Sequence, residues 1–147
     1  PRKGAKFLVG NLWYQVTRSD VKNGTVTVVK AKNKNYKSIN IKSTVKIKGH
    51  TFKITAIGKK AFYKNKGLTS IKVGKNIVKI DSYAFYGCTK LKSVRIYSTK
   101  LKTVGKKAFG KTAKNIEVRV PKNPKKLLKK YQNLLKKGGS KKAKYKR

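Results

Sequence analysis

Apolar and polar residues in the middle of the chain recur with a period of 23 or 24 residues. The run Ile-Gly-Lys-Lys-Ala-Phe at residues 57–62 returns in related form at residues 80–85 and 104–109, each time ending in Ala-Phe. A period in the twenties is typical of repeat proteins in which each repeat forms one coil and buries its apolar residues against the next coil. The pattern therefore predicts a solenoid.

A second block follows each Ala-Phe pair and alternates apolar with polar residues. Its copies occupy residues 68–73, 91–96 and 115–120, and residues 36–41 fit as a founding copy 32 residues before the next one. Alternation with a period of two indicates short strands that have one buried face. We expect four such strands stacked in parallel, with Phe62, Phe85 and Phe109 on the opposite side of the coil. The longer first interval fits a hairpin insertion at residues 48–52.

The two ends of the chain have the patterns of caps. Residues 12–17 and 24–29 read as two strands joined by a turn-rich segment, which predicts an N-terminal β-hairpin cap. Asn123 and Pro124 are suited to the start of a helix and Gly138 to its end. Between them, apolar residues recur at helical spacing: Leu127, Leu128, Tyr131, Leu134 and Leu135.

These elements predict an α/β-type solenoid, a short leucine-rich-repeat stack with parallel strands. Its parts are an N-terminal β cap at residues 1–35, the solenoid at 36–121, an amphipathic capping helix at 122–138 and a disordered basic tail at 139–147. The helix has a second interpretation, because a Leu/Tyr stripe opposed by lysines also suits contact with an anionic membrane surface. No run approaches the roughly 18 to 20 apolar residues of a membrane span.

The repeated blocks resemble a known family. The Ile-Gly-x-x-Ala-Phe block, its continuation Tyr86-Gly87-Cys88-Thr89-Lys90-Leu91 and the strand that follows are similar to BspA-like bacterial leucine-rich repeats. The resemblance covers about residues 36–120 and departs from the pattern at Asn115, which replaces the usual Leu where the solenoid ends. It implies a bacterial protein that is secreted or displayed on the cell surface, with a role in adhesion or other extracellular binding.

The resemblance also implies no catalytic residues and no cofactor. BspA-like repeats often form a module of a larger chain, and we expect this module to be monomeric. The sequence begins Pro1-Arg2-Lys3, without a Met or an apolar signal region, so we expect a mature fragment or an excised domain.

The balance of charged residues argues against two further classes of function, catalysis and metal binding. The 147 residues include 42 Lys and Arg but only 3 Asp and Glu and 1 His, which gives a formal net charge of +39. General acid–base catalysis and metal binding need carboxylates or histidines in one place. The whole supply is Asp20, Asp81, Glu117 and His50, so we predict that the protein is not an enzyme and has no metal site.

Structural roles are available for the residues with reactive side chains. Cys88 aligns with Asn65 and Thr112, which predicts a side chain that hydrogen-bonds the turn backbone, and His50 is expected to be solvated. Gly58, Asp81 and Gly105 share one repeat position, which suggests a left-handed backbone or a helix-start cap. Asp20 lies in a turn, and Glu117 is expected to pair with Arg119.

Outward-facing strand residues are predicted to form columns across the coils. Ser38, Ser70, Ser93 and Glu117 form one, and Asn40, Lys72, Arg95 and Arg119 form the next. Like charges at a strand spacing of about 4.8 Å repel one another, and a polyanion laid across the sheet would relieve that repulsion. The candidate polyanion-binding residues are Lys72, Lys92, Arg95, Tyr97 and Arg119.

The expected partners are anionic polymers, such as teichoic acid and acidic glycans, or host surface proteins. Non-specific nucleic-acid binding through lysines is an alternative, and a structural or protein-interaction scaffold is another. The charge also serves solubility, although Asp and Glu or mixed charge would do so better. Arginine occurs only at positions 2, 18, 95, 119 and 147, which argues against a bidentate code for bases or discrete phosphates.

Overall fold

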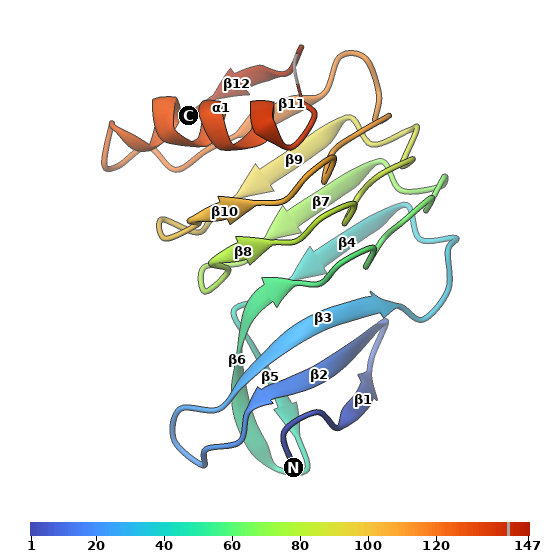
Figure 1. Ribbon diagram of the computed structural model, residues 1–147, viewed down its shortest axis with the longest axis vertical. Coiled ribbons are helices and arrows are strands. Elements are labelled where there is room, and N and C mark those ends of the chain that lie inside the picture. The colour runs from blue at the N-terminus through green and yellow to red at the C-terminus, as the bar shows by residue number, and fades with distance from the viewer. Residues whose placement is uncertain (141) are drawn as a thin grey trace.

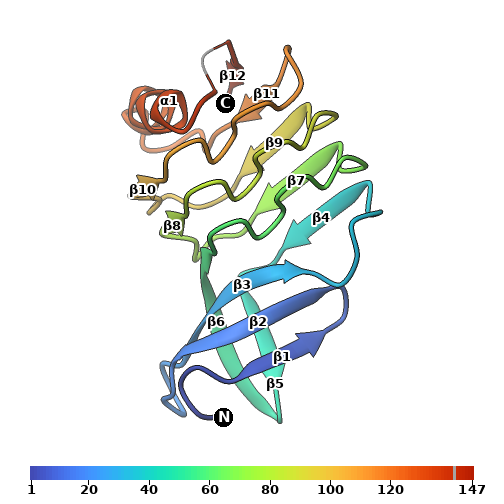
Figure 2. The same cartoon turned by 45° about the vertical axis from the view of Figure 1, so that its right-hand side comes forward.

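The computed structural model describes residues 1–140 and 142–147 and confirms the solenoid. Its repeating element is a five-stranded parallel sheet with the order β12-β11-β9-β7-β4. The strands are β4 (Ser38–Ile41), β7 (Ser70–Val73), β9 (Ser93–Ile96), β11 (Glu117–Arg119) and β12 (Lys144–Lys146). Figures 1 and 2 show the coils stacked between N-terminal strands at one end and a helix at the other.

A second sheet has the order β1-β2-β3-β6-β8-β10 and includes the N-terminal cap. Its strands are β1 (Lys6–Val9), β2 (Leu12–Arg18), β3 (Thr25–Ala31), β6 (His50–Ile57), β8 (Lys79–Ile80) and β10 (Thr103–Val104). The cap therefore has three antiparallel strands where the sequence predicted two. The missed strand, β1, is short and only half-buried, so its apolar signal is weak.

The hairpin insertion predicted in the first coil is confirmed. The strand β5 (Thr44–Ile47) pairs antiparallel with β6, and Ile47 lies opposite His50. Lys48 and Gly49 form the turn with positive φ angles of 53° and 79°, as a two-residue hairpin turn of the I′ type requires. Because β6 also pairs in parallel with β3 and β8, this hairpin joins the cap to the coils.

The core is built from the two apolar sets that the repeats predicted. The inward residues of β7 and β9 are at most 2% exposed: Ile71, Val73, Val94 and Ile96. On the other side of the coils, Phe62, Phe85 and Phe109 form a stack with 5.1 Å between successive ring centroids. Each Phe side chain is at most 1% exposed, so each coil completes the core of its neighbour.

Neither role predicted for Gly58, Asp81 and Gly105 is found, because none has a left-handed backbone and no described helix begins there. Within each repeat, positive φ angles fall two residues later, at Lys60, Tyr83 and Lys107 (57°, 59° and 53°), and six residues later, at Lys64, Gly87 and Lys111 (55°, 77° and 52°). Glycine is required instead by close packing, because a Cβ at Gly58 would lie 2.9 Å from the carbonyl oxygen of Val28.

The C-terminal helix α1 (Leu127–Lys137) caps the solenoid, as predicted, but begins three residues later than Pro124. Residues 124–127 form a turn in which the N–H of Leu127 donates to Pro124 O at 3.1 Å. No side chain caps the helix N-terminus, so the expected role of Asn123 is not found.

Buried side chains of α1 face the last coils. Leu127, Tyr131 and Leu135 are buried, and the Tyr131 hydroxyl donates to Ser98 O at 2.7 Å and accepts from Leu101 N–H at 3.2 Å. The apolar stripe is therefore used in capping, which contradicts the interpretation of this helix as a membrane-surface element. In the described part of the chain, no helix is long and apolar enough to cross a membrane.

The prediction of a disordered tail at residues 139–147 was wrong. β12 pairs in parallel with β11, so that Glu117, Val118 and Arg119 lie opposite Lys144, Tyr145 and Lys146. Tyr145 and Ala143 pack against the core, and this apolar contact outweighs the high local charge. Lys141 of the predicted tail lies outside the described residues.

We predict that Phe85→Ala lowers the free energy of unfolding by about 3–5 kcal/mol, since it removes the middle ring of the stack and leaves a cavity. Urea denaturation followed by circular dichroism measures the change. Val21→Ala is the matched control, because Val21 is 76% exposed, and its effect should stay within about 0.5 kcal/mol. A loss below about 1 kcal/mol for Phe85→Ala would show that the stack is not essential.

Candidate anion-binding face of the parallel sheet

The outer face of the parallel sheet aligns one polar residue from each coil. Asn40 lies beside Lys72, Lys72 beside Arg95, and Arg95 beside Arg119, which confirms the predicted register. β12 adds Lys146 next to Arg119. We call Lys72, Arg95, Arg119 and Lys146 the cationic column; all four side chains are exposed.

A second column runs beside the first and is mostly neutral. It consists of Ser38, Ser70, Ser93, Glu117 and Lys144. Glu117 pairs with Lys146, with 3.6 Å between Nζ and Oε2, and not with Arg119 as the sequence predicted. The reason is that β12, which the sequence placed in a disordered tail, brings Lys146 onto the sheet. This exposed ion pair contributes at most about 1 kcal/mol to stability.

Hollows follow the cationic column along the sheet. The central one, which we call the sheet groove, has a volume of about 370 Å³. It is lined on its polar side by Ser70, Lys72, Ser93, Arg95, Glu117 and Arg119. A hollow of about 510 Å³ adjoins it through the shared residue Lys72, and one of about 330 Å³ adjoins it through Arg95 and Arg119. The three hollows therefore adjoin one another along the exterior of the sheet, and cations line each of them.

Four of the five candidate residues line these hollows. Tyr97 lines the two outer ones, and the guanidinium carbon of Arg95 lies 4.9 Å from the centre of its ring, at cation–π distance. Lys92 is exposed at the start of β9, where its N–H donates to Thr69 O at 3.0 Å, but its side chain lines none of the described hollows.

The sequence missed several cations that the fold adds to this surface. Lys42 and Lys75 line the hollow next to β4, and Lys122 and Arg147 line the one next to β11. Lys42, Lys75 and Lys122 lie in loops, which the strand repeat does not align. The strand pattern Lys-Tyr-Lys at residues 144–146 was the available signal for the end of the chain, since it repeats the alternation of Glu117, Val118 and Arg119.

Electrostatic repulsion within the column is substantial. Two unit charges about 4.8 Å apart repel by about 1 kcal/mol in water and by about 3.5 kcal/mol at an effective dielectric constant near 20. Salt screening reduces both figures. Among the residues that line the sheet groove, Glu117 is the one acid, and it is paired with Lys146. Most of the positive charge on this face therefore has no counter-charge in the described structure.

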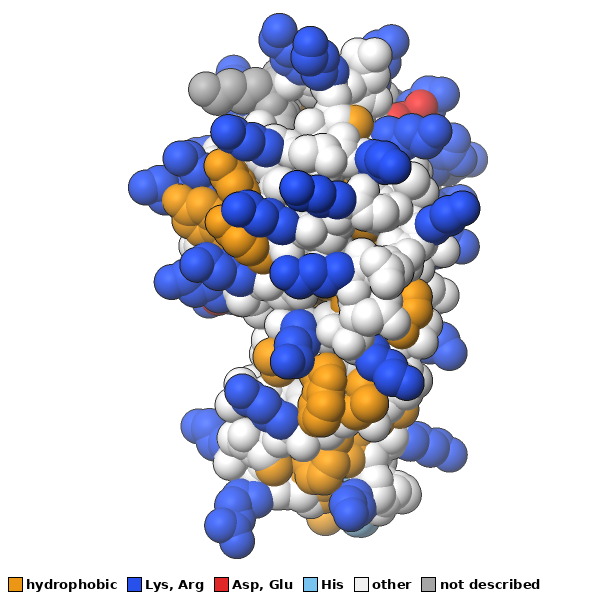
Figure 3. All heavy atoms as spheres, turned by 90° about the vertical axis from the view of Figure 1, so that its right-hand side faces the viewer, with side chains coloured by type: hydrophobic (Ala, Val, Ile, Leu, Met, Phe, Trp, Pro, Cys, Tyr) orange, Lys and Arg blue, Asp and Glu red, His pale blue; other side chains and the backbone are white. Residues whose placement is uncertain are grey.

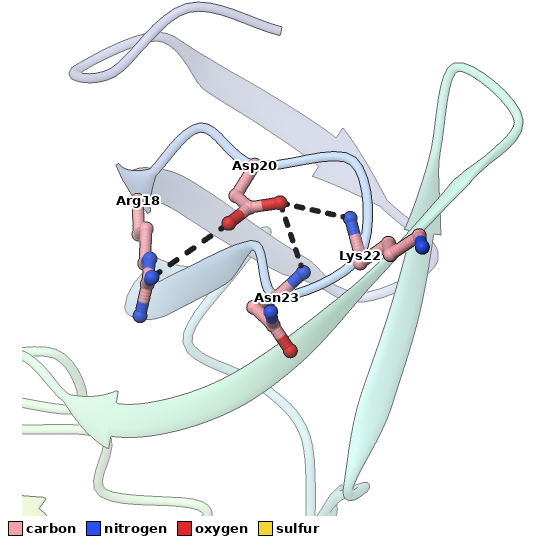
Figure 4. A network of polar contacts seen from close by, with 4 residues as sticks. All are labelled: Arg18, Asp20, Lys22 and Asn23. Atoms are coloured by element: carbon pink, nitrogen blue, oxygen red, sulfur yellow. Dashed lines mark hydrogen bonds and ion pairs between the residues drawn. The ribbon is translucent and has the colours of Figure 1, made fainter.

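The remaining acids have structural partners elsewhere. Asp20 accepts hydrogen bonds from the N–H groups of Lys22 and Asn23 at 3.0 and 3.3 Å and lies 3.7 Å from Arg18 (Figure 4). These backbone hydrogen bonds, and more weakly Arg18, lower the pKa of Asp20. The turn role predicted for Asp20 is confirmed.

Asp81 accepts from the N–H of Ser82 at 2.7 Å and lies 3.5 Å from Lys79. His50 is exposed in β6. Within residues 1–140 and 142–147, no group of three or more His, Cys, Asp and Glu residues is arranged to hold a metal ion.

Cys88 has the predicted structural role. Its thiol is fully buried and donates to Phe62 O of the preceding coil at 3.0 Å, whereas the Thr112 hydroxyl donates to Phe109 O of its own turn at 3.2 Å. Burial raises the pKa of Cys88 to about 12, and a backbone hydrogen bond from Asn65 opposes this only in part. The thiol is therefore protonated at neutral pH.

Comparison with known proteins defines the class. The structure is a parallel solenoid that resembles crystal structures of bacterial leucine-rich-repeat proteins. A leucine-rich cell surface protein from Faecalibacterium prausnitzii A2-165 is 23% identical, with a TM-score of 0.63 over 82% of this chain and 38% of that protein. A leucine-rich repeat protein from Bacteroides capillosus is 22% identical, with a TM-score of 0.65 over 81% of this chain and 88% of that protein.

A third crystal structure, of a leucine-rich repeat protein from Bacteroides ovatus, is 24% identical with a TM-score of 0.59, over 78% of this chain and 36% of that one. This chain thus spans well under half the length of two of the three. No curated protein matches the sequence.

The family described as BspA type leucine rich repeat region matches residues 55–133 in 6 copies. The chain belongs to this family, whose members generally serve as non-catalytic binding scaffolds.

We predict that Cys88 resists alkylation in the folded protein. With a pKa of about 12, roughly one thiol in ten thousand is ionised at pH 8, and the thiolate is the reactive form. Iodoacetamide labelling followed by mass spectrometry should show no modification of native protein within an hour. Protein in 6 M guanidinium chloride is the control and should be labelled fully. Similar labelling rates in the two states would contradict the structural role of Cys88.

Proposed function

We propose that this chain is a non-catalytic module of a secreted or cell-surface bacterial protein that binds anionic polymers along the outer face of its parallel sheet. The carrying observation is the cationic column, whose side chains come from successive coils and of which Lys72, Arg95 and Arg119 line adjoining hollows. The polymers that fit are those with repeated negative charges, such as teichoic acid and acidic glycans.

The spacing of the column supports a polymer rather than a single small ion. The strands β7, β9, β11 and β12 each present one cation, about 4.8 Å from the next, so an extended polyanion contacts several of them at once. Binding relieves repulsion within the column and releases counterions from the polymer, which makes the affinity depend steeply on salt. On the side of the molecule that Figure 3 draws, which is the right-hand side of Figure 1, Lys and Arg side chains are also spread over the whole length, with little Asp or Glu.

The absence of a catalytic role is supported by the partners of the acidic groups. Asp20, Asp81 and Glu117 each have a cationic or backbone partner and lie in different parts of the fold. The surface location is supported by the family and by the relative from Faecalibacterium prausnitzii, which is described as a cell surface protein.

Replacement of Lys72, Arg95 and Arg119 together by Ser should weaken heparin binding at least tenfold at low salt, because it removes three adjacent cations from the groove. Ser replacement of Lys22, Lys34 and Lys59, which are exposed in turns and bends, is the matched control, since it removes the same net charge. Fluorescence anisotropy with labelled heparin measures both affinities. Equal losses from the two variants would show that total charge decides binding and the sheet does not.

The same assay separates a general polyanion binder from a nucleic-acid binder. Heparin and double-stranded DNA, compared at two salt concentrations, should bind with affinities that follow their charge densities and fall together as salt rises. A strong preference for DNA that persists at 150 mM salt would instead favour nucleic acid as the ligand. No binding to either polymer at that ionic strength would favour a scaffold without polyanion affinity.

A second candidate function, the binding of an acidic peptide, is favoured by a separate observation. β4 lies at the edge of its sheet, with β7 as its one strand partner among the described strands. Beside this edge is a cavity of about 580 Å³ with apolar residues Val9, Leu12 and Val45 and with Lys46 on its wall. An open strand edge next to apolar pockets suits the addition of an extended peptide.

The peptide function predicts measurable binding of a ten-residue peptide that alternates Glu and Val. Lys46→Glu should weaken it about tenfold by charge reversal while heparin affinity changes little, because Lys46 does not line the sheet groove. Lys22→Glu is the control with the same change in charge. The candidate fails if the peptide does not bind or if both variants weaken it equally.

A further inference from the structure

Three of the five arginines in the chain line one cavity. Arg95, Arg119 and Arg147 surround a hollow of about 330 Å³ at the C-terminal end of the sheet, together with Tyr97 and Lys122. The other two arginines lie far away in the sequence and in the N-terminal cap. The low number of arginines in the sequence argued against recognition of discrete phosphates, but their placement in the fold argues for it.

The stacking of the coils brings these arginines together. Arg95 in β9 and Arg119 in β11 are directly paired neighbours in the sheet. Arg147 follows β12, whose residues pair with those of β11 up to Lys146 opposite Arg119. Side chains separated by 24 and 28 residues in the sequence therefore line one cavity.

The cavity lacks an acidic side chain. None of its lining residues in the described structure is Asp or Glu, and the nearest acid along the sheet, Glu117, is paired with Lys146. The lining also includes Ile96 and Val120, whose side chains are buried in the core and only 2% exposed, so the exposed side chains around the cavity are mainly the cations and Tyr97.

Tyr97 orients one of the three guanidinium groups. The guanidinium carbon of Arg95 lies 4.9 Å from the centre of the Tyr97 ring, at cation–π distance. Arginine donates two parallel hydrogen bonds to the oxygens of a phosphate or sulfate, whereas lysine acts as a point charge. Three guanidinium groups around a small cavity therefore suit one tetrahedral oxyanion.

We propose that this cavity binds a single phosphate or sulfate group, carried as an ester on a larger anionic molecule. A volume of about 330 Å³ is at the lower end of the range for small-molecule sites, about 300–1,000 Å³, and accommodates the anionic group with part of its carrier. This inference rests on the proposed function and deepens it. The cavity shares Arg95 and Arg119 with the sheet groove, so a polymer in the groove has one ester group fixed at this end.

The test keeps the charge and changes only the geometry of the donors. Arg95→Lys, Arg119→Lys and Arg147→Lys are combined in one variant, which retains the net charge of +39. Isothermal titration calorimetry in Tris at low chloride compares inorganic phosphate, inorganic sulfate and acetate. Wild-type protein should bind phosphate or sulfate with one-to-one stoichiometry at least tenfold more tightly than acetate, and the triple variant should lose at least tenfold of that affinity.

A double variant, Arg2→Lys with Arg18→Lys, is the control for arginine loss outside the cavity and should bind the oxyanions as wild type does. Arg95→Lys alone keeps the test decisive if the triple variant does not fold. The proposal is overturned if phosphate and sulfate bind no better than acetate, or if the folded variant retains wild-type affinity. A phosphorylated and a sulfated monosaccharide then distinguish the two ester classes, and a preference for either one supports the proposal.

Failure of this inference is distinguishable from failure of the proposed function. If heparin binds wild type and the lysine variant equally, while neither binds inorganic oxyanions, the polymer face stands and the discrete site is rejected. If wild-type protein binds no polyanion at all, the proposed function is rejected, and this inference falls with it.

Discussion

The structure depends on the in-register stacking of coils that cannot bury their apolar residues alone. The Phe62, Phe85 and Phe109 rings stack at 5.1 Å on one side, and the strands β4, β7, β9 and β11 pair residue for residue on the other. The repeat that aligns the inward residues also aligns the outward ones. A cation at one outward repeat position therefore becomes a column of cations, as a direct consequence of how the core is built.

The same constraint explains both ends of the molecule. An exposed last coil would leave apolar surface and strand edges in water, and α1 and β12 cover this end through Leu127, Tyr131 and the pairing with β11. At the N-terminal end, β3 continues the second sheet through β6, but β4 has no partner on its outer side among the described strands. The parallel sheet thus has an edge strand at each end, β12 and β4, and the β4 edge lies beside the cavity of about 580 Å³ that Val9, Leu12 and Val45 help to line.

The sequence correctly predicted the features that follow from the repeat period. It failed for segments whose structure depends on contacts outside the repeat. The register of Lys72, Arg95 and Arg119 followed from the period, as did the phenylalanine stack and the hydrogen bond of Cys88. The ordering of β12 did not follow, because it rests on two small apolar contacts within a basic segment whose local composition favours disorder.

The wrong prediction of a disordered tail also led to errors in the predicted anion-binding face. With residues 144–147 assigned to a disordered tail, Glu117 was given Arg119 as its partner instead of Lys146, and Arg147 was left out of the charged face. The prediction of a left-handed backbone at Gly58 and Gly105 was wrong for a different reason. These glycines are needed because a Cβ would clash with a neighbouring segment, and neither has a positive φ angle. Contacts between elements distant in the sequence carry no signal in a short local pattern.

Charge count and charge placement have different consequences in this protein. A formal charge of +39 spread over a surface attracts any polyanion with little discrimination. Guanidinium groups present directed donors, and here strand pairing places Arg95 beside Arg119 while Tyr97 contacts Arg95. In our proposal, the lysines attract polyanions at long range, while the few arginines donate directed hydrogen bonds to individual anionic groups. In the oxyanion site that we propose, discrimination among anions depends on the stacking of the coils and not on the total number of cations, because the pairing of β9 with β11 fixes the backbones of Arg95 and Arg119.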